Sequence, residues 1–182
     1  YLRMVAESSS KLGHLFFGRE RLVEARTNYE EALEINRRLV AVDRSNALRQ
    51  RDLSATLNAM GDVLEKQNLL PQALAYYEQS LAIARDLEAQ DPRNAQRKRD
   101  VASALVGMAS IQKEIGKADD AMVNYKIAHK RIEELASAAP GDRRWPLYLK
   151  RIEADMASVR KAIPARSTII QGSDSPQKQA SD

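Results

Sequence analysis

The chain repeats itself, because the same residue types return every 48 positions without a gap along its 182 residues. Arg51-Asp52-Leu53 returns as Arg99-Asp100-Val101, and Tyr29 returns as Tyr77 and Tyr125. A period of this size matches one supersecondary unit, and such units stack because none can bury its apolar face alone. The repeat therefore predicts a solenoid that presents a surface, with units at about 1–45, 46–93 and 94–141.

Each unit is predicted to be a pair of helices, here called helix A and helix B. The apolar residues Leu53, Leu57, Met60 and Leu64 are spaced by four, three and four, which places them on one helical face. Asn46 is a candidate N-cap for this helix. We expect no strand, with helix A at 1–17, 47–67 and 95–115 and helix B at 21–42, 71–90 and 119–138.

The turn residues between the two helices support this division. Asn68 and Gly116 occupy the same place in successive units, and both residue types tolerate the left-handed conformation that closes a helix. Pro71 follows at the first turn of the next helix, where its missing N–H costs nothing.

A seventh helix is predicted at 142–163, beginning at Asp142 and burying residues such as Trp145 and Ile152. No helix B follows it, so we expect a capping helix and a repeat domain over 1–163. Residues 164–182 are predicted to be a disordered tail, because they contain little that could be buried. The counterpart of Asn46 in the first unit falls before Tyr1, which suggests that the chain is part of a longer protein.

Composition narrows the class of protein. The chain has 43% hydrophobic residues and no apolar run approaching the roughly 18 residues that a membrane-spanning helix needs. It contains no cysteine, which excludes disulfides and thiolate sites and agrees with the reducing cytoplasm that we expect. The formal charge of +4, from 29 basic and 25 acidic residues, is weak support for nucleic-acid binding.

The repeated residues resemble the tetratricopeptide repeat family. Its pattern places a large residue, Leu-Gly and an aromatic in helix A, and small, aromatic and small residues in helix B. In this pattern, Gly or Ala lets the two backbones approach, while Tyr fills the wedge between neighbouring hairpins. The second unit supplies Leu57, Met60, Gly61, Leu64, Ala73, Tyr77 and Ser80, and the first and third units agree at most of these seven positions.

The period of 48 residues exceeds the 34 of the usual repeat. Together with the linker Asp91-Pro92-Arg93-Asn94, it resembles a long-period bacterial variant of the family. The resemblance implies an all-α, right-handed superhelical solenoid of three hairpins plus the C-terminal capping helix. It also implies a non-catalytic scaffold for protein–protein interaction.

The resemblance further implies that a partner protein or peptide binds in the concave groove lined by helix A. We expect Asn58 and Asp62 to face the partner without serving the hairpin contacts, and Phe17 to provide the single apolar contact. A clamp for C-terminal carboxylates is not predicted, since its positions hold Ser10, His14, Ser103 and Gly107. The predicted groove residues are Glu7, Ser10, His14, Phe17, Asn58, Asp62, Glu65, Ser103, Val106, Ser110 and Lys113.

An alternative stays open, in which the chain is a regulatory or self-assembly segment of a larger multidomain enzyme or signalling protein. Its contacts would then be with other parts of its own chain or with further copies of itself, as a homo-oligomer. We predict no catalytic residue, cofactor or metal, because His14 and His129 lie in different units without ligand spacing. Nucleic-acid binding is a minor third hypothesis, resting on basic residues that recur near the start of each helix A. We expect nearby acids such as Asp52 and Asp100 to pair with them.

Overall fold

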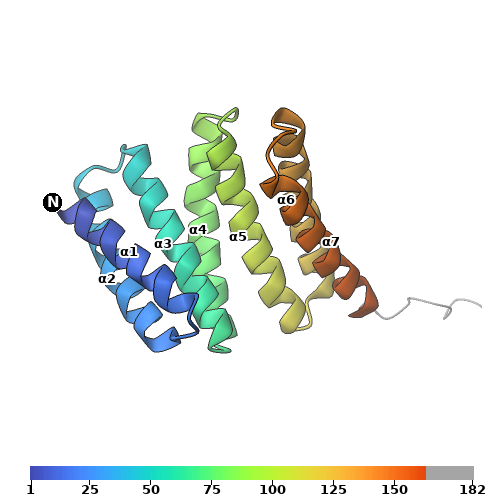
Figure 1. Cartoon of the computed structure of the whole chain (residues 1–182), viewed down its shortest axis with the longest axis horizontal. Helices are drawn as coiled ribbons and strands as arrows, with labels where there is room; N and C mark the ends of the chain where they lie inside the picture. The colour runs from blue at the N-terminus through green and yellow to red at the C-terminus, as the bar shows by residue number, and fades with distance from the viewer. Residues whose placement is uncertain (163–182) are drawn as a thin grey trace, which may run out of the picture.

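The computed structural model describes residues 1–162, and within them the chain forms seven α-helices and no strand. The helices run back and forth as successive antiparallel hairpins, with α1, α3, α5 and α7 along one side and α2, α4 and α6 behind them (Figure 1). This is the predicted all-α solenoid. The bounds are α1 Leu2–Phe17, α2 Leu22–Val42, α3 Ala47–Lys66, α4 Leu70–Gln90, α5 Ala95–Glu114, α6 Ala118–Ala138 and α7 Arg144–Ala162.

The helix starts follow from their caps. The Asn46 side chain accepts a hydrogen bond from the backbone N–H of Arg49, and the Asn94 side chain accepts from those of Gln96 and Arg97. Asp142 accepts from the backbone N–H of Arg144, so α7 begins two residues later than predicted.

The turns from helix A to helix B repeat with the sequence. Asn68 has φ 59° and Gly116 has φ 81°, which confirms the predicted left-handed closures. Glu20 takes the same conformation, with φ 59°, in the first unit. The glutamate at this position gave no signal in the sequence, because the conformation is uncommon for such a residue.

The core is built around the repeated tyrosines. Tyr29, Tyr77 and Tyr125 are at most 1% exposed and extend from helix B into the hairpin packing. A Cβ at Gly61 would lie 2.6 Å from the Tyr77 ring, and one at Gly107 would lie 2.3 Å from it. The Tyr77 ring therefore lies between α3 and α5 and joins two successive hairpins.

The two ends of the solenoid differ. At the C-terminal end, α7 buries Trp145, Ile152 and Val159 in the core of the last hairpin, as predicted for a capping helix. At the N-terminal end, Leu12 and Leu15 are 46% and 47% exposed. The predictions for Ile163 and for the tail at 164–182 lie outside the described residues.

Candidate partner-binding face

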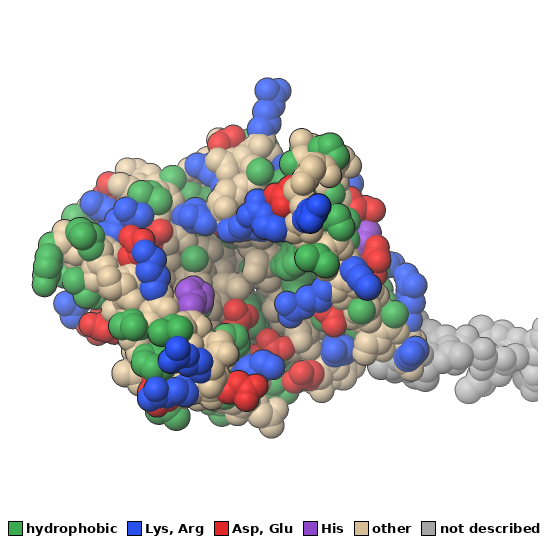
Figure 2. All heavy atoms as spheres, in the orientation of Figure 1, with side chains coloured by type: hydrophobic (Ala, Val, Ile, Leu, Met, Phe, Trp, Pro, Cys, Tyr) green, Lys and Arg blue, Asp and Glu red, His purple; other side chains and the backbone are tan. Residues whose placement is uncertain are grey.

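The face formed by α1, α3, α5 and α7 is hollowed at its middle (Figure 2). Basic side chains gather above the hollow, and several acidic side chains lie below it. One cavity on this face has a volume of about 420 Å³. It is lined by His14, Ser54, Ala55, Asn58, Ser80, Arg99, Asp100, Ser103, Arg144, Trp145 and Tyr148.

A second cavity of about 270 Å³ adjoins the first toward the N-terminal hairpin. His14 and Ala55 line both cavities, so the two form a continuous depression across α1, α3, α5 and the start of α7. Among the predicted groove residues, His14, Asn58 and Ser103 line the larger cavity, and Glu7, Ser10 and His14 line the smaller.

Three predicted groove residues, Asp62, Glu65 and Ser110, make hydrogen bonds within the fold. The Tyr77 hydroxyl donates to Oδ1 of Asp62 at 2.7 Å and to Oε2 of Glu65 at 2.9 Å. Ser110 Oγ donates to Oε1 of Glu65 at 2.6 Å. The expectation that Asp62 is independent of the hairpin contacts was therefore wrong, because its carboxylate accepts the hydrogen bond of the core tyrosine.

Asn58 is also tied to the fold. Its Nδ2 donates to Ser103 Oγ at 3.3 Å, which links α3 to α5 of the next hairpin. Its Oδ1 is buried and has no hydrogen-bond partner within the described chain.

The remaining predicted residues are divided between the surface and the core. Val106 is 8% exposed and belongs to the core, so it offers little surface to a partner. Phe17 packs against the core of the first two hairpins and lines neither concave cavity. The larger cavity is instead lined by the aromatic side chains of Trp145 and Tyr148 of the capping helix. Lys113 is partly buried near the end of α5 and also lies outside both cavities.

Burial shifts the pKa values of several titratable groups at or near this face. Burial raises the pKa of Asp62 to about 6, although the hydrogen bond from Tyr77 opposes the shift. Burial also raises the pKa values of Tyr77 and Tyr148 and lowers that of His14. His14 Nδ1 lies 2.7 Å from the Tyr29 hydroxyl, and the two rings make an edge contact at 5.3 Å.

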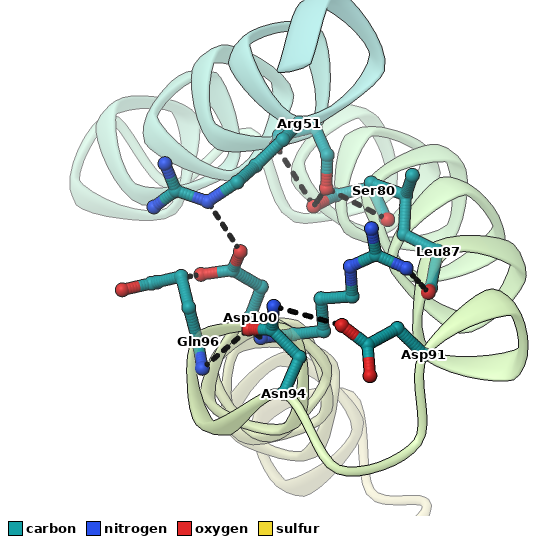
Figure 3. A network of polar contacts seen from close by, with 9 residues as sticks. Arg51, Ser80, Leu87, Asp91, Asn94, Gln96 and Asp100 are labelled. Carbon is teal, nitrogen blue, oxygen red and sulfur yellow. Dashed lines mark hydrogen bonds and ion pairs between the residues drawn. The ribbon is translucent and has the colours of Figure 1, made fainter. Parts of the chain in front are cut away.

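A ladder of ion pairs crosses the N-terminal ends of the A helices. Arg3 Nε lies 2.9 Å from Asp52 Oδ2, and Arg51 Nε lies 2.9 Å from Asp100 Oδ2. Figure 3 shows the second step, in which Gln96 of α5 also donates to the Asp100 carboxylate, at 2.6 Å. Arg51 and Arg99 belong to the basic residues that recur near the start of each helix A, and both line the concave cavities.

His129 lies away from this face, between α6 and α7. It is partly buried, and its Nε2 lies 3.2 Å from Oε1 of Glu153. Over residues 1–162, no group of three or more His, Cys, Asp or Glu residues could hold a metal ion. None of the seven helices described is long and apolar enough to cross a membrane.

The fold and its concave face define a helical-repeat protein of the solenoid class. Residues 4–86 match the sequence model of the tetratricopeptide repeat, which supports the family inferred from the repeated residues. Among curated protein sequences, none matches this chain.

Solved structures show the same fold at low sequence identity. The yeast histone chaperone Hif1, described as a scaffold protein recruiting protein complexes to core histones, is similar with a TM-score of 0.60 and 19% identity over 81% of this chain. The chain spans 58% of the length of that protein. BtubC from P. vanneervenii has a TM-score of 0.55 and 16% identity, over 100% of this chain and 73% of its own.

A third similar structure is the C-terminal tetratricopeptide-containing domain of a putative FK506-binding protein from Plasmodium falciparum. Its TM-score is 0.50 at 17% identity, covering 88% of this chain and 93% of that domain. Tetratricopeptide repeats are in general scaffolds for protein–protein interaction, and they are typically non-catalytic. At these identities the solved structures support the fold of the chain and carry no partner over to it.

Proposed function

We propose that the chain is a protein-interaction module that binds a peptide segment or domain of a partner protein on its concave face. The observation that carries this proposal is the continuous hollow across α1, α3, α5 and α7. Its lining combines hydroxyl and amide groups with the rings of Trp145 and Tyr148. Such a lining suits an extended or helical peptide held by a few hydrogen bonds around an apolar contact.

The alanine at the middle of the hollow provides a test. Ala55 lines both cavities and is exposed, so Ala55→Arg would fill the hollow without disturbing the core. Ala82 is an exposed alanine in the middle of α4, outside both cavities, and Ala82→Arg is the matched control. Arginine is a good helix former, so both variants should keep their helicity.

The measurement is selection of binders from a random peptide library on the unchanged protein, followed by affinity measurement on both variants. We expect Ala55→Arg to weaken binding at least about tenfold, and Ala82→Arg to leave it unchanged. Equal affinity for both variants would place the partner on another face and refute the concave site.

Self-association is the competing outcome of the same test. If the library yields no binder and the protein sediments as a dimer that Ala55→Arg dissociates, the hollow serves assembly. Absence of a nucleic-acid ligand, a cytoplasmic location and the long-period bacterial type of the repeat stay predictions from the sequence.

A further inference from the structure

The ion-pair ladder on the concave face follows the 48-residue repeat of the sequence. Each step joins an arginine of one helix A to an aspartate of the next, first Arg3 of α1 with Asp52 of α3 and then Arg51 of α3 with Asp100 of α5. Both steps use arginine Nε and aspartate Oδ2 at the same distance of 2.9 Å. The pairing is therefore a property of the repeated unit.

The third step lacks its acid. Arg99 of α5 is the next arginine of the ladder, and the position that would supply the carboxylate on α7 is Tyr148. Within residues 1–162, Arg99 makes no ion pair or side-chain hydrogen bond, and it lines the 420 Å³ cavity. An arginine that elsewhere in this fold holds a carboxylate thus lies beside an open hollow.

The other charged groups around this cavity already have partners. The Asp100 carboxylate is held by Arg51 and Gln96, and the Arg144 guanidinium by Asp142. The ring of His14 contacts Tyr29. Among the described charged side chains that line this cavity, Arg99 is therefore the one without a partner, and its charge is positive.

Trp145 is a second notable residue of the cavity. Trp145 is 7% exposed, lines the cavity, and has a buried Nε1 with no hydrogen-bond partner in the described chain. Indole Nε1 can only donate a hydrogen bond, and this one has no acceptor among the described residues. Guanidinium and carboxylate match in their planar, two-pronged geometry, and such pairs are strong where water is partly excluded.

We propose that the cavity binds the side-chain carboxylate of an aspartate or glutamate in a partner peptide, which pairs with Arg99 in place of the acid that α7 lacks. This inference rests on the proposed function and names the chemistry of its partner. The peptide supplies in trans what Asp52 and Asp100 supply within the chain, while Trp145 and Tyr148 cover its apolar part. A side-chain carboxylate, and not a row of phosphates, fits a cavity with a single unpaired cation.

The decisive variant restores the missing acid within the chain. Tyr148→Asp places a carboxylate at the ladder position facing Arg99, so it should occupy the guanidinium and exclude the peptide. Tyr148→Asn removes the same ring without adding charge. Leu147→Asp adds the same charge at the neighbouring position, whose side chain is 71% exposed and lies outside the cavity.

The probe is a peptide selected from a random library on the 182-residue chain, synthesised with its acidic residues intact or individually changed to the corresponding amides. We expect one amide change to weaken binding about tenfold or more. We also expect Tyr148→Asp to bind at least about tenfold more weakly than Tyr148→Asn, with Leu147→Asp resembling the unchanged protein.

Three results would overturn the inference. If amide changes have no effect, or if Tyr148→Asp and Tyr148→Asn bind the peptide equally, the carboxylate is not recognised, although peptide binding in the hollow would stand. If a single-stranded oligonucleotide binds in a Tyr148→Asp-sensitive manner and acidic peptides do not, the anion is a phosphate.

A readout that needs no library separates this inference from the proposed function. The Nε–Hε resonance of Arg99 can be followed by NMR while the capped tripeptide Ala-Asp-Ala or its Ala-Asn-Ala control is added. We expect a saturable shift with the aspartate peptide only, abolished in Tyr148→Asp and kept in Leu147→Asp. Identical responses to both tripeptides would refute carboxylate recognition at Arg99 even if larger peptides bind elsewhere on the face.

Discussion

The hydroxyl of Tyr77 donates a 2.7 Å hydrogen bond to Oδ1 of Asp62, and this contact joins α4 to α3 within the second hairpin. The ring of Tyr77 is fully buried between α3 and α5, while its hydroxyl lies among the carboxylates of Asp62 and Glu65. A substitution at Asp62 therefore also changes the environment of a core residue.

The first prediction concerns the hydroxyl of that tyrosine. Tyr77→Phe should lower the free energy of unfolding by about 1–3 kcal/mol, because the Asp62 carboxylate loses its donor and the Glu65 carboxylate keeps only that from Ser110. Tyr77→Ala should cost about 3–5 kcal/mol, since it also leaves a cavity. The neighbouring Tyr76→Phe is the control, because no hydrogen bond of the Tyr76 side chain is found within the described chain. Urea denaturation of the three variants measures these differences, and equal stability of both Phe variants would contradict the role of the Tyr77 hydroxyl.

The second prediction concerns the close approach of α5 to the same ring. Gly107→Ala should destabilise the protein by about 1–3 kcal/mol, because the added Cβ would lie 2.3 Å from the Tyr77 ring. Gly141→Ala is the matched control, since a Cβ there meets nothing within 4 Å. Thermal unfolding followed by circular dichroism compares the two. An unchanged melting temperature for Gly107→Ala would mean that the hairpins separate at little cost.

The third prediction concerns the start of α5. The Asn94 side chain accepts hydrogen bonds from the backbone N–H groups of Gln96 and Arg97, at 3.1 and 3.3 Å. Asn94→Ala should therefore cost about 1 kcal/mol, whereas Asn94→Asp keeps an acceptor and should retain most of the stability. Chemical denaturation measures both, and a neutral Asn94→Ala would show that the cap is dispensable.

Much of this architecture could be predicted because the repeat presents each position more than once. Caps at Asn46 and Asn94 and buried tyrosines at 29, 77 and 125 each carry a local physical signature, which the 48-residue period then confirms. The left-handed Glu20 was missed because its own residue type gives no such signature.

The concave face was predicted less well, because helical periodicity assigns a side chain to a face without saying what lies opposite. Asp62 and Glu65 do project from helix A, but the Tyr77 hydroxyl reaches them through the hairpin. Phe17 was expected to contact a partner and instead packs against the core. One signal for the cavity was present in the sequence and was missed, since the aspartate that recurs at 52 and 100 is replaced by Tyr148.

The last prediction concerns the charge of Asp62 and its dependence on pH. Burial raises the pKa of this carboxyl in the folded protein to about 6, against 3.8 for an unperturbed aspartate. Between these values the folded state keeps a proton that the unfolded state has lost, so this group makes the protein less stable as pH rises from about 4 to about 7. The full effect is up to about 3 kcal/mol.

Asp62→Asn should remove that dependence while its amide oxygen still accepts the hydrogen bond from Tyr77. Relative to the unchanged protein, we expect this variant to be more stable at about pH 7.5 and to lose the advantage by about pH 4. Asp86→Asn, on an exposed position of α4, is the control and should show no such trend. Urea denaturation at several pH values measures the free energy of unfolding of each protein. If the difference in this free energy between Asp62→Asn and the unchanged protein stays constant with pH, the raised pKa of Asp62 is contradicted.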